Sequence, residues 1–542
     1  MKFRFAPLAL ALVAASSQAM TDNELRQVVD QRLKGDRTGA CMAVAVIDKA
    51  SVARTFACAD QNEAARVDAR SAFEIGSVSK TMTSALLAEL IGQGKASLDD
   101  PLSEYLPTGT RTPEYQGNKI LLRHVVTHTS GLPALPARLG ATGIDDPYVN
   151  LTEAALLASL GDATLSSAPG TEFKYSNFAS MVLSYAVARR AGEDYETLIR
   201  QHLFAPLQMD GAYIKQVPTG IRAAQGHSPN RKAVPAWNFS TNLAGVGGVR
   251  ATLDDMVKYV QGELGQAAVA ITPALKLSQQ QVSTNPPMAM NWMLMPVGSR
   301  TVHVHEGGTG GFSSFVAFDN ERQRGVVILS DTTWNSLGSL GTLGLHLVDE
   351  SFPLGKPRRT VNAPAELLKG LVGDYQLEGA MTMKLSLKDG ALVVQAQGQP
   401  QYTMRYDDAG DFYTLDFDAL LRPARTSRGY GFTWMQMGGS MAAQRLDSEV
   451  AKPKVELAPE KLREYAGDYP LVPGFGLKVM EKDGKLFIQG TGQQPIEVSA
   501  VQADAFVADV VAAEIQFERD AAGKVVALTL LQGGQKLRGE RQ

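Results

Sequence analysis

The sequence of 542 residues predicts an α+β protein, in which an antiparallel sheet flanked by helices precedes two small antiparallel β-barrel-like domains. Two observations predict this fold class. Alternating apolar and polar residues, typical of strands, lie at both ends of a helical middle, which favours one antiparallel sheet closed by terminal segments with helices packed against it. After about residue 357 an internal repeat begins, in which short alternating runs are separated by turns.

The first 19 residues have the features of a signal peptide. Lys2 and Arg4 precede an apolar stretch from 6 to 15, and Ser17-Gln18-Ala19 is a small-x-small site suited to signal peptidase. We expect cleavage before Met20 and a periplasmic or secreted protein; a buried N-terminal helix is the alternative. We expect no membrane span, because no later stretch has the roughly 20 uninterrupted apolar residues that a span requires.

The two cysteines, Cys41 and Cys58, flank the alternating segments 42–47 and 52–57. A two-residue turn at Lys49-Ala50 would place the cysteines directly opposite each other in a hairpin. We therefore predict a disulfide, which an exported location permits. Two buried free thiols are the alternative.

Between the terminal strand patterns, the spacing of apolar residues predicts several helices. The first begins after Ser77-Val-Ser-Lys80, is apolar enough to be buried on most sides, and ends near Gly92. The predicted helices cover residues 81–91, 151–160, 178–191, 196–204 and 253–264. Strand patterns return at residues 301–305, 313–318 and 325–330.

The C-terminal part contains two copies of one unit. Gly373-Asp374-Tyr375 recurs as 467–469, Lys388-Asp389-Gly390 as 482–484, and Phe412 as Phe506, always with the same offset. Asp-Gly turns between short alternating runs are typical of an antiparallel barrel or sandwich. With linkers expected at 355–364 and 451–459, the predicted domains are 1–19 (signal peptide), 20–352 (main body), 360–450 (first repeat) and 456–542 (second repeat).

The composition is that of an ordinary globular protein, with 44% hydrophobic and 20% charged residues and a formal net charge of −3. This charge shows no bias toward polyanions, so we expect no nucleic-acid partner. We expect a small-molecule or peptide substrate.

Ser77-Val-Ser-Lys80 fits the pattern Ser-x-x-Lys, which has only two fixed positions and is weak evidence alone. Its place at a helix start strengthens it, because residues three apart share a helix face and Lys80 can reach the Ser77 hydroxyl. Free backbone N–H groups and the positive dipole end at a helix start also favour an oxyanion. The pattern predicts Ser77 as a nucleophile assisted by Lys80.

Tyr175-Ser-Asn177 is a second candidate motif. A phenol with a pKa of about 10 can act as an acid–base group only if nearby positive charge lowers that value, so we expect Lys80 to lower the pKa of Tyr175. The amide of Asn177 can orient both Lys80 and a substrate carbonyl. An ordinary surface turn after Pro169-Gly170 is the alternative.

His305-Glu-Gly307-Gly308 ends one strand pattern and precedes another. The glycines would let a substrate backbone lie against the strand, and the N–H of Gly308 is a candidate second oxyanion donor. His303 and His305 alternate onto one face, which is also the pattern of half a zinc site. Neither His-Glu-x-x-His nor a clear third and fourth ligand is present in the sequence, so we predict no metal and no cofactor.

Together these motifs resemble the superfamily of class C β-lactamases, serine DD-carboxypeptidases, D-aminopeptidases and related esterases. The resemblance covers about residues 39–350 and implies a β-lactamase/transpeptidase-like fold. It implies that Ser77 is the nucleophile, that Lys80 and Tyr175 share the acid–base work, and that the amides of Ser77 and Gly308 form the oxyanion hole. The two C-terminal domains further resemble D-aminopeptidase architecture. The shared segments, besides the three motifs above, are 98–107, 122–133, 169–171 and 247–256.

One departure narrows the expected substrate. The β-lactamases of this superfamily usually have Lys-Thr-Gly where this chain has His305-Glu306-Gly307, and neutral histidine binds a carboxylate less firmly. Residues 326–345 also contain no Lys or Arg. We therefore expect an exported serine hydrolase that cleaves an amide or ester, such as a D-amino-acid peptide or a small ester. The alternatives are a class C-like β-lactamase and a catalytically silent binder of peptidoglycan fragments.

Overall fold

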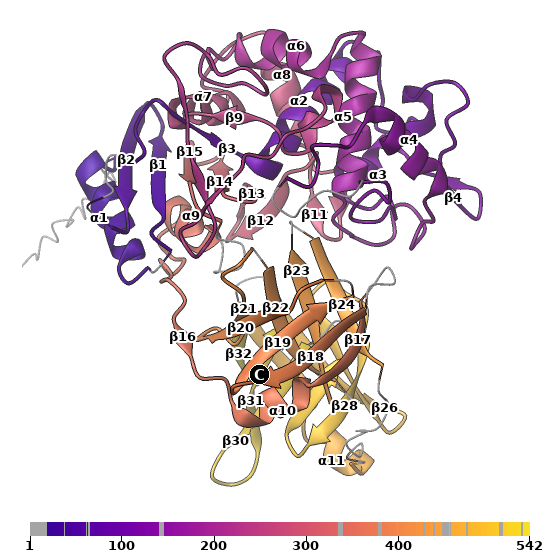
Figure 1. Ribbon diagram of the computed structural model, residues 1–542. Coiled ribbons are helices and arrows are strands. Elements are labelled where there is room, and N and C mark those ends of the chain that lie inside the picture. Colours follow the sequence, from indigo (N-terminus) through magenta and orange to yellow (C-terminus); the bar gives the residue numbers. More distant parts are fainter. Residues whose placement is uncertain are drawn as a thin grey trace, which may run out of the picture.

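The computed structural model describes most of residues 19–542 as a helical and β-stranded body followed by two β-barrels (Figure 1). The predicted signal peptide lies outside the described residues, apart from Ala19. None of the described helices has both the length and the apolar character needed to cross a membrane. Within 19–542 the residues not described are 37, 61, 63–65, 140–145, 334–339, 378–381, 398, 418, 427–428, 437–438, 447–454, 456, 473–474, 509–512 and 533–534.

An antiparallel sheet of eight strands, in the order β10-β11-β12-β13-β14-β15-β1-β2, forms the middle of the body. Strands from the two ends of the body pair within this sheet, with Val44 of β1 opposite Ile328 of β15. The prediction of one sheet closed by terminal segments is therefore confirmed. Its strands are β1 (Cys41–Asp48), β2 (Ser51–Cys58), β10 (Ser283–Thr284), β11 (Pro287–Met288), β12 (Met293–Val297), β13 (Arg300–Gly308), β14 (Ser313–Asp319) and β15 (Arg324–Ser330).

Helices cover both faces of this sheet, because successive residues of a strand point to opposite faces. Val44 packs in a core with α1 and α9, whereas Ala45 packs in a larger core with α2, α5, α7 and α8. The helices of the body are α1 (Asp22–Leu33), α2 (Ser79–Gly92), α3 (Leu122–Val126), α4 (Glu153–Asp162), α5 (Asn177–Ala191), α6 (Tyr195–Ile199), α7 (Leu253–Glu263), α8 (Thr272–Ser278) and α9 (Gly341–Val348).

Short elements connect the larger ones around the sheet. Single helical turns lie at η2 (Gly76–Val78), η3 (Leu102–Tyr105), η4 (Arg200–Phe204) and η5 (Thr241–Val246). Two-residue strands and β3 form small sheets: β3 (Ser71–Glu74) with β6 (Arg222–Ala223) and β9 (Arg250–Ala251), β4 (Glu114–Tyr115) with β5 (Asn118–Lys119), and β7 (Gly226–His227) with β8 (Ala233–Val234).

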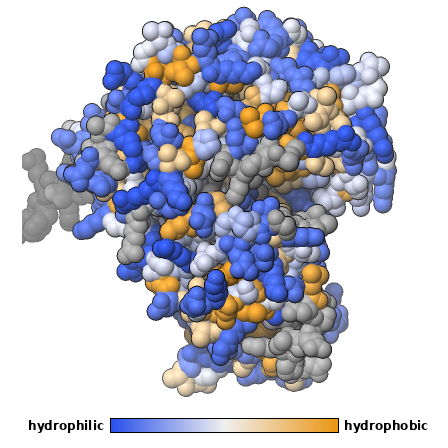
Figure 2. Space-filling model, viewed as in Figure 1, coloured by the Kyte–Doolittle hydropathy of each residue, from blue (hydrophilic) through white to orange (hydrophobic). Residues whose placement is uncertain are grey.

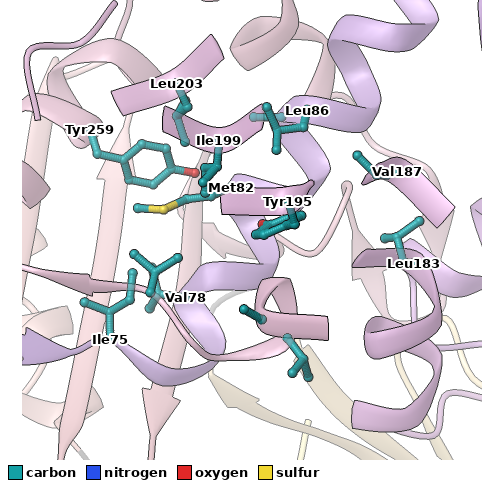
Figure 3. Close-up of a cluster of buried hydrophobic side chains, with 14 of the residues drawn as sticks. Ile75, Val78, Met82, Leu86, Leu183, Val187, Tyr195, Ile199, Leu203 and Tyr259 are labelled. Atoms are coloured by element: carbon teal, nitrogen blue, oxygen red, sulfur yellow. The ribbon is translucent and has the colours of Figure 1, made fainter. Parts of the chain in front are cut away.

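Helix α2 is buried on most sides, as its sequence predicts. Residues 79–88 are all buried, and Figure 3 shows Met82 and Leu86 among side chains of neighbouring helices, such as Tyr195 and Tyr259. The polar groups of the helix have partners in this core: the Thr81 hydroxyl lies 2.8 Å from that of Tyr259. This packing anchors the helix that follows Ser77.

The predicted helices are confirmed, with one difference. The segment predicted as one helix over 196–204 is divided into α6 and the π-helical turn η4, where Ala205 N–H donates to the carbonyl of Arg200. The spacing of apolar residues does not distinguish a continuous α-helix from a helix that ends in a π-helical turn, because both forms can bury Leu203 and Phe204.

The first two strands form the predicted hairpin. Lys49 and Ala50 make the turn, Lys49 in the left-handed region with φ 54°, and Cys41 lies opposite Cys58 in the register. The two cysteines are joined in a disulfide. The bond connects β2, at the edge of the sheet, to its neighbour β1.

The first repeat is a closed barrel, since β17 pairs with β24 and β20 pairs with β21. The predicted linker 355–364 is partly structured: β16 pairs with β20, and Arg358 forms ion pairs with Asp407 and Asp411. The elements are β16 (Thr360–Val361), α10 (Ala365–Leu371), β17 (Gly373–Leu377), β18 (Thr382–Lys388), β19 (Ala391–Ala396), β20 (Tyr402–Asp407), β21 (Phe412–Tyr413), β22 (Ala419–Thr426), β23 (Gly429–Gln436) and β24 (Gly439–Arg445).

The second repeat is a nearly closed barrel. Its first and last strands, β25 and β32, approach each other, and beyond β32 the N–H of Gln542 donates to the carbonyl of Asp468. The elements are α11 (Pro459–Arg463), β25 (Gly467–Val472), β26 (Phe475–Lys482), β27 (Lys485–Gly490), β28 (Ile496–Gln502), β29 (Ala505–Ala508), β30 (Ala513–Arg519), β31 (Val525–Gln532) and β32 (Gln535–Glu540).

The two barrels share the details that their repeated residues predict. Asp389 and Asp483 occupy the same left-handed conformation, each with φ 52°, in the turn that joins two strands. The hydroxyl of Tyr375 donates to the carbonyl of Leu371, and that of Tyr469 donates to the carbonyl of Tyr465. On the face drawn in Figure 2, hydrophilic residues predominate and hydrophobic residues form small scattered groups over the body and the barrels.

Candidate active site

Ser77 lies in the single turn η2, between strand β3 and helix α2. It is partly exposed, whereas every other residue from 71 to 80 is buried. Nζ of Lys80 donates to Oγ of Ser77 at 2.8 Å and to the carbonyl of Val246 at 2.8 Å. The pKa of Lys80 is well below its usual range, because burial disfavours the charged amine.

Tyr175 approaches Ser77 and Lys80 from the segment before helix α5. Nζ of Lys80 lies 5.1 Å from the centre of the Tyr175 ring. Burial raises the pKa of Tyr175, and its hydrogen bond with Ser77 opposes this shift in part. The expectation that Lys80 lowers the pKa of this phenol is wrong, because removal from water raises this pKa; Tyr175 therefore keeps its proton at neutral pH.

His128 holds the Tyr175 segment on both sides. Lys174 N–H donates to the carbonyl of His128 at 2.7 Å, and Ser176 N–H donates to its Nδ1 at 3.2 Å. Between these two bonds, the rings of His128 and Tyr175 stack with centroids 4.2 Å apart. Asn177 follows as the first residue of α5 and is buried.

Strand β13 packs directly against the turn that carries Ser77. A Cβ atom at Gly307 would lie 2.1 Å from the carbonyl oxygen of Ile75 and 2.9 Å from the nitrogen of Ser77, and one at Gly76 would lie 2.5 Å from the nitrogen of Gly308. Glycine is therefore required at Gly307 and Gly76 because this chain's own backbone occupies the space. The close approach brings the amides of Ser77 and Gly308 onto adjacent backbone segments.

His305 lies on β13 with 4% of its surface exposed, and its Nδ1 is 2.5 Å from the carbonyl oxygen of Asn291. Burial lowers the pKa of His305 to about 4, and Lys80 contributes to this shift, so the ring is neutral at pH 7. His303, two residues earlier, has Nε2 3.1 Å from the carbonyl of Gln279. The described residues contain no group of three or more His, Cys, Asp or Glu placed to hold a metal ion.

The predicted site residues thus meet from distant parts of the chain, except for the cysteines, which lie in the hairpin. Two buried residues near them were not predicted, His128 and Asn291. His128 is part of the segment 122–133, but its function cannot be read from that segment. Asn291 follows Met288-Ala289-Met290 without any motif, and its one unusual feature, a φ of 60°, is visible only in the structure.

Comparison with protein families agrees with this geometry. The family model described as "Beta-lactamase" matches residues 25–338, which is more than half of the chain and includes Ser77, Lys80, Tyr175 and His305. The chain belongs to the Beta-lactamase family and is a serine hydrolase of the β-lactamase and DD-carboxypeptidase class. A second model, "Domain of unknown function (DUF3471)", matches residues 451–541.

Individual relatives cover the body of the chain. The D-alanyl-D-alanine-carboxypeptidase/endopeptidase AmpH of Escherichia coli K12 is 30% identical over 310 residues, which are 53% of this chain and 78% of AmpH. A protein of the same strain named Beta-lactamase is 26% identical over 346 residues, 55% of this chain and 88% of that protein. The solved structure of a Beta-lactamase/D-alanine carboxypeptidase from Yersinia pestis, complexed with citrate, matches with a TM-score of 0.50 and 25% identity, over 60% of this chain and 97% of the other.

Proposed function

We propose that the protein is exported and cleaves an amide or ester, a D-amino-acid peptide or a small ester, through an acyl-enzyme on Ser77. One observation carries this proposal: the buried amine of Lys80 lies 2.8 Å from the Ser77 hydroxyl, which is itself partly exposed. Export is proposed from the signal-like residues 1–19 alone.

The first step requires a base, and Lys80 has the properties of one. Because burial lowers its pKa, the amine can be uncharged. Its lone pair can then accept the Ser77 proton while one N–H still donates to the Val246 carbonyl. The serine oxygen then bonds to the substrate carbonyl carbon, and the N–H groups of Ser77 and Gly308 stabilise the oxyanion.

The second step requires an acid, and Tyr175 keeps its proton. The phenol donates this proton to the departing nitrogen or oxygen as the bond to the carbonyl carbon breaks, and the protonated amine of Lys80 returns a proton to the phenol oxygen. Water then attacks the carbonyl carbon of the acyl-enzyme and gives a proton to the neutral amine of Lys80. The bond between this carbon and the serine oxygen breaks, and the serine oxygen takes the proton back from Lys80 as the product acid leaves. All protons exchanged are thus held by Ser77, Lys80, Tyr175, substrate and water.

The neutral state of His305 supports a peptide or ester substrate over a β-lactam antibiotic. The carboxylate of a β-lactam would find no positively charged side chain at this position at pH 7, since the pKa of His305 is about 4. The printed name of the AmpH relative, a carboxypeptidase and endopeptidase, also supports a peptide substrate.

Three rates test the proposal: hydrolysis of nitrocefin, of p-nitrophenyl acetate and of a D-alanyl anilide, measured beside covalent labelling with a fluorophosphonate probe. We expect labelling of Ser77 and higher kcat/KM for the ester or anilide than for nitrocefin. Faster hydrolysis of nitrocefin would make the protein a β-lactamase. Absence of both labelling and turnover would favour the silent binder of peptidoglycan fragments.

A further inference from the structure

Asn291 connects two buried imidazoles that approach the active site from different segments. It lies in the turn between β11 and β12 and is 1% exposed. Its carbonyl oxygen is 2.5 Å from Nδ1 of His305, and its side chain faces His128, where it favours a proton on that ring. Its Nδ2 donates to Oγ of Ser84 at 2.8 Å, which leaves Oδ1 as the atom directed toward other partners.

The tautomer of His128 follows from its contacts. Its Nδ1 accepts the N–H of Ser176, so this nitrogen carries no proton. Burial, with Lys80 and His305 nearby, lowers the pKa of His128 well below its usual range, so the ring is neutral and its proton is on Nε2. Among the described residues, neither this Nε2 nor Oδ1 of Asn291 has a hydrogen-bond partner. The donor and the acceptor are therefore complementary.

The tautomer of His305 is the opposite one. A carbonyl oxygen can only accept, so Nδ1 of His305, next to the Asn291 carbonyl, must carry the proton. Nε2 of the neutral ring is then an acceptor. No described residue forms a hydrogen bond with this Nε2.

We propose that His128 and His305 are held as opposite neutral tautomers, the first by the N–H of Ser176 and the second by the carbonyl of Asn291. In this arrangement His128 orients Tyr175, and His305 presents an acceptor to the substrate. This inference rests on the proposed hydrolase function. The acceptor selects a substrate that offers an N–H or O–H group there, such as a peptide amide or an amine. A carboxylate, which only accepts, finds no complementary group on His305.

The direct test is the 15N NMR spectrum of the imidazoles in the full-length protein at pH 7. The sequence contains seven histidines, and spectra of His128→Gln and His305→Gln assign the two signals. We expect two neutral rings, with the proton on Nε2 in His128 and on Nδ1 in His305. A charged ring at either position, or the same tautomer at both, would overturn the proposal.

A variant pair tests the positioning by Asn291. Asn291→Gly removes the amide but keeps the left-handed backbone, because glycine adopts positive φ without strain. Gln208→Gly is the matched control, since it removes an exposed amide at a φ of 58° outside the site. We expect Asn291→Gly to keep both tautomers, because Ser176 still donates to His128 and the carbonyl at position 291 remains beside His305. We expect its kcat/KM to stay within about tenfold of that of the natural protein.

The outcomes separate this inference from the proposed function. If the fluorophosphonate probe does not label Ser77 in the natural protein, the hydrolase proposal fails, whatever the imidazole spectrum shows. If Ser77 is labelled but either ring has the other tautomer, in the natural protein or in Asn291→Gly, the positioning role fails and the hydrolase stands. Unchanged thermal stability of both variants would exclude unfolding as the cause of a lower rate.

Discussion

Nζ of Lys80 lies 2.8 Å from Oγ of Ser77, and a second contact of 2.8 Å with the carbonyl of Val246 fixes the same atom from the other side. The amine is therefore placed by the backbone of η5 as well as by its own helix. Because Lys80 is 1% exposed, water does not compete for these contacts.

Replacement of the nucleophile should abolish chemistry without unfolding the protein. We expect Ser77→Ala to lose turnover and fluorophosphonate labelling, because no acyl-enzyme can form, while the thermal midpoint stays unchanged. The exposed Ser103, replaced by alanine, is the matched control and should retain both. Labelling that persists at another serine of Ser77→Ala, found by mass spectrometry, would contradict the assignment.

The rate should increase with pH on the acid side of its profile. Below the pKa of Lys80 the amine is protonated and cannot accept the Ser77 proton; above this pKa it is free to do so. Since burial lowers this pKa well below the usual value for lysine of about 10.4, we expect the rise in kcat/KM to be complete at a lower pH than an ordinary lysine would allow. A rate that falls as the pH rises through the pKa of Lys80 would show that the protonated amine is the active form.

Substitution of His305 by lysine should change substrate preference. Lysine would restore a permanent cation, and one charge-assisted contact of about 1.5 to 3 kcal/mol would favour a substrate carboxylate. We expect the kcat/KM of carboxylate-bearing β-lactams to rise about tenfold relative to neutral esters, which corresponds to about 1.4 kcal/mol. His305→Gln, which adds no charge, is the control. An equal decrease for both substrate classes would show instead that His305 acts on Tyr175.

Loss of the disulfide should destabilise the body. The bond between Cys41 and Cys58 closes a loop with a sequence separation of 17, for which chain entropy gives about 3 kcal/mol. We expect the double variant Cys41→Ala/Cys58→Ala to have a free energy of unfolding lower by this amount. Tryptophan fluorescence during urea unfolding would show the lower midpoint concentration. The natural protein with a reductant should match the double variant. Unchanged unfolding in both cases would mean that the disulfide does not constrain the unfolded chain.

The body should fold without the two barrels. The large cores of the body share no residue with the cores of the barrels, while Phe352 and Leu354 pack in the core formed with α9. We therefore propose the body as a domain of its own, and expect a chain that ends after Gly355 to be soluble and to show cooperative thermal unfolding. A chain that ends after Glu350 lacks the two apolar side chains and should be less stable. An insoluble product in both cases would contradict independent domains.

Local rules predicted the parts of the molecule that depend on neighbouring residues. The register of Cys41 and Cys58 follows from a turn of two residues, and the contact of Ser77 with Lys80 follows from a spacing of three on a helix. The equivalent turns at Asp389 and Asp483 likewise follow from their repeated residues.

Tertiary burial was not predictable in the same way. The pKa of Tyr175 moves opposite to expectation, because its environment is created by segments that are far apart in the chain. His128 and Asn291 lie more than 150 residues apart, and no spacing rule connects them. Sequence therefore predicts candidate reacting groups for this site but not the groups that set their protonation.

The pairing of β1 with β15 determines when the body can fold. Met42 lies opposite Ser330, so this pair of strands joins segments separated by almost the entire body. Contacts so distant in sequence slow folding, because a long loop must close before they form. During synthesis, β1 and the hairpin it shares with β2 must wait for the last strand of their sheet, with apolar faces uncovered. A protein with this topology therefore depends on protection from aggregation until nearly all of its body has been made.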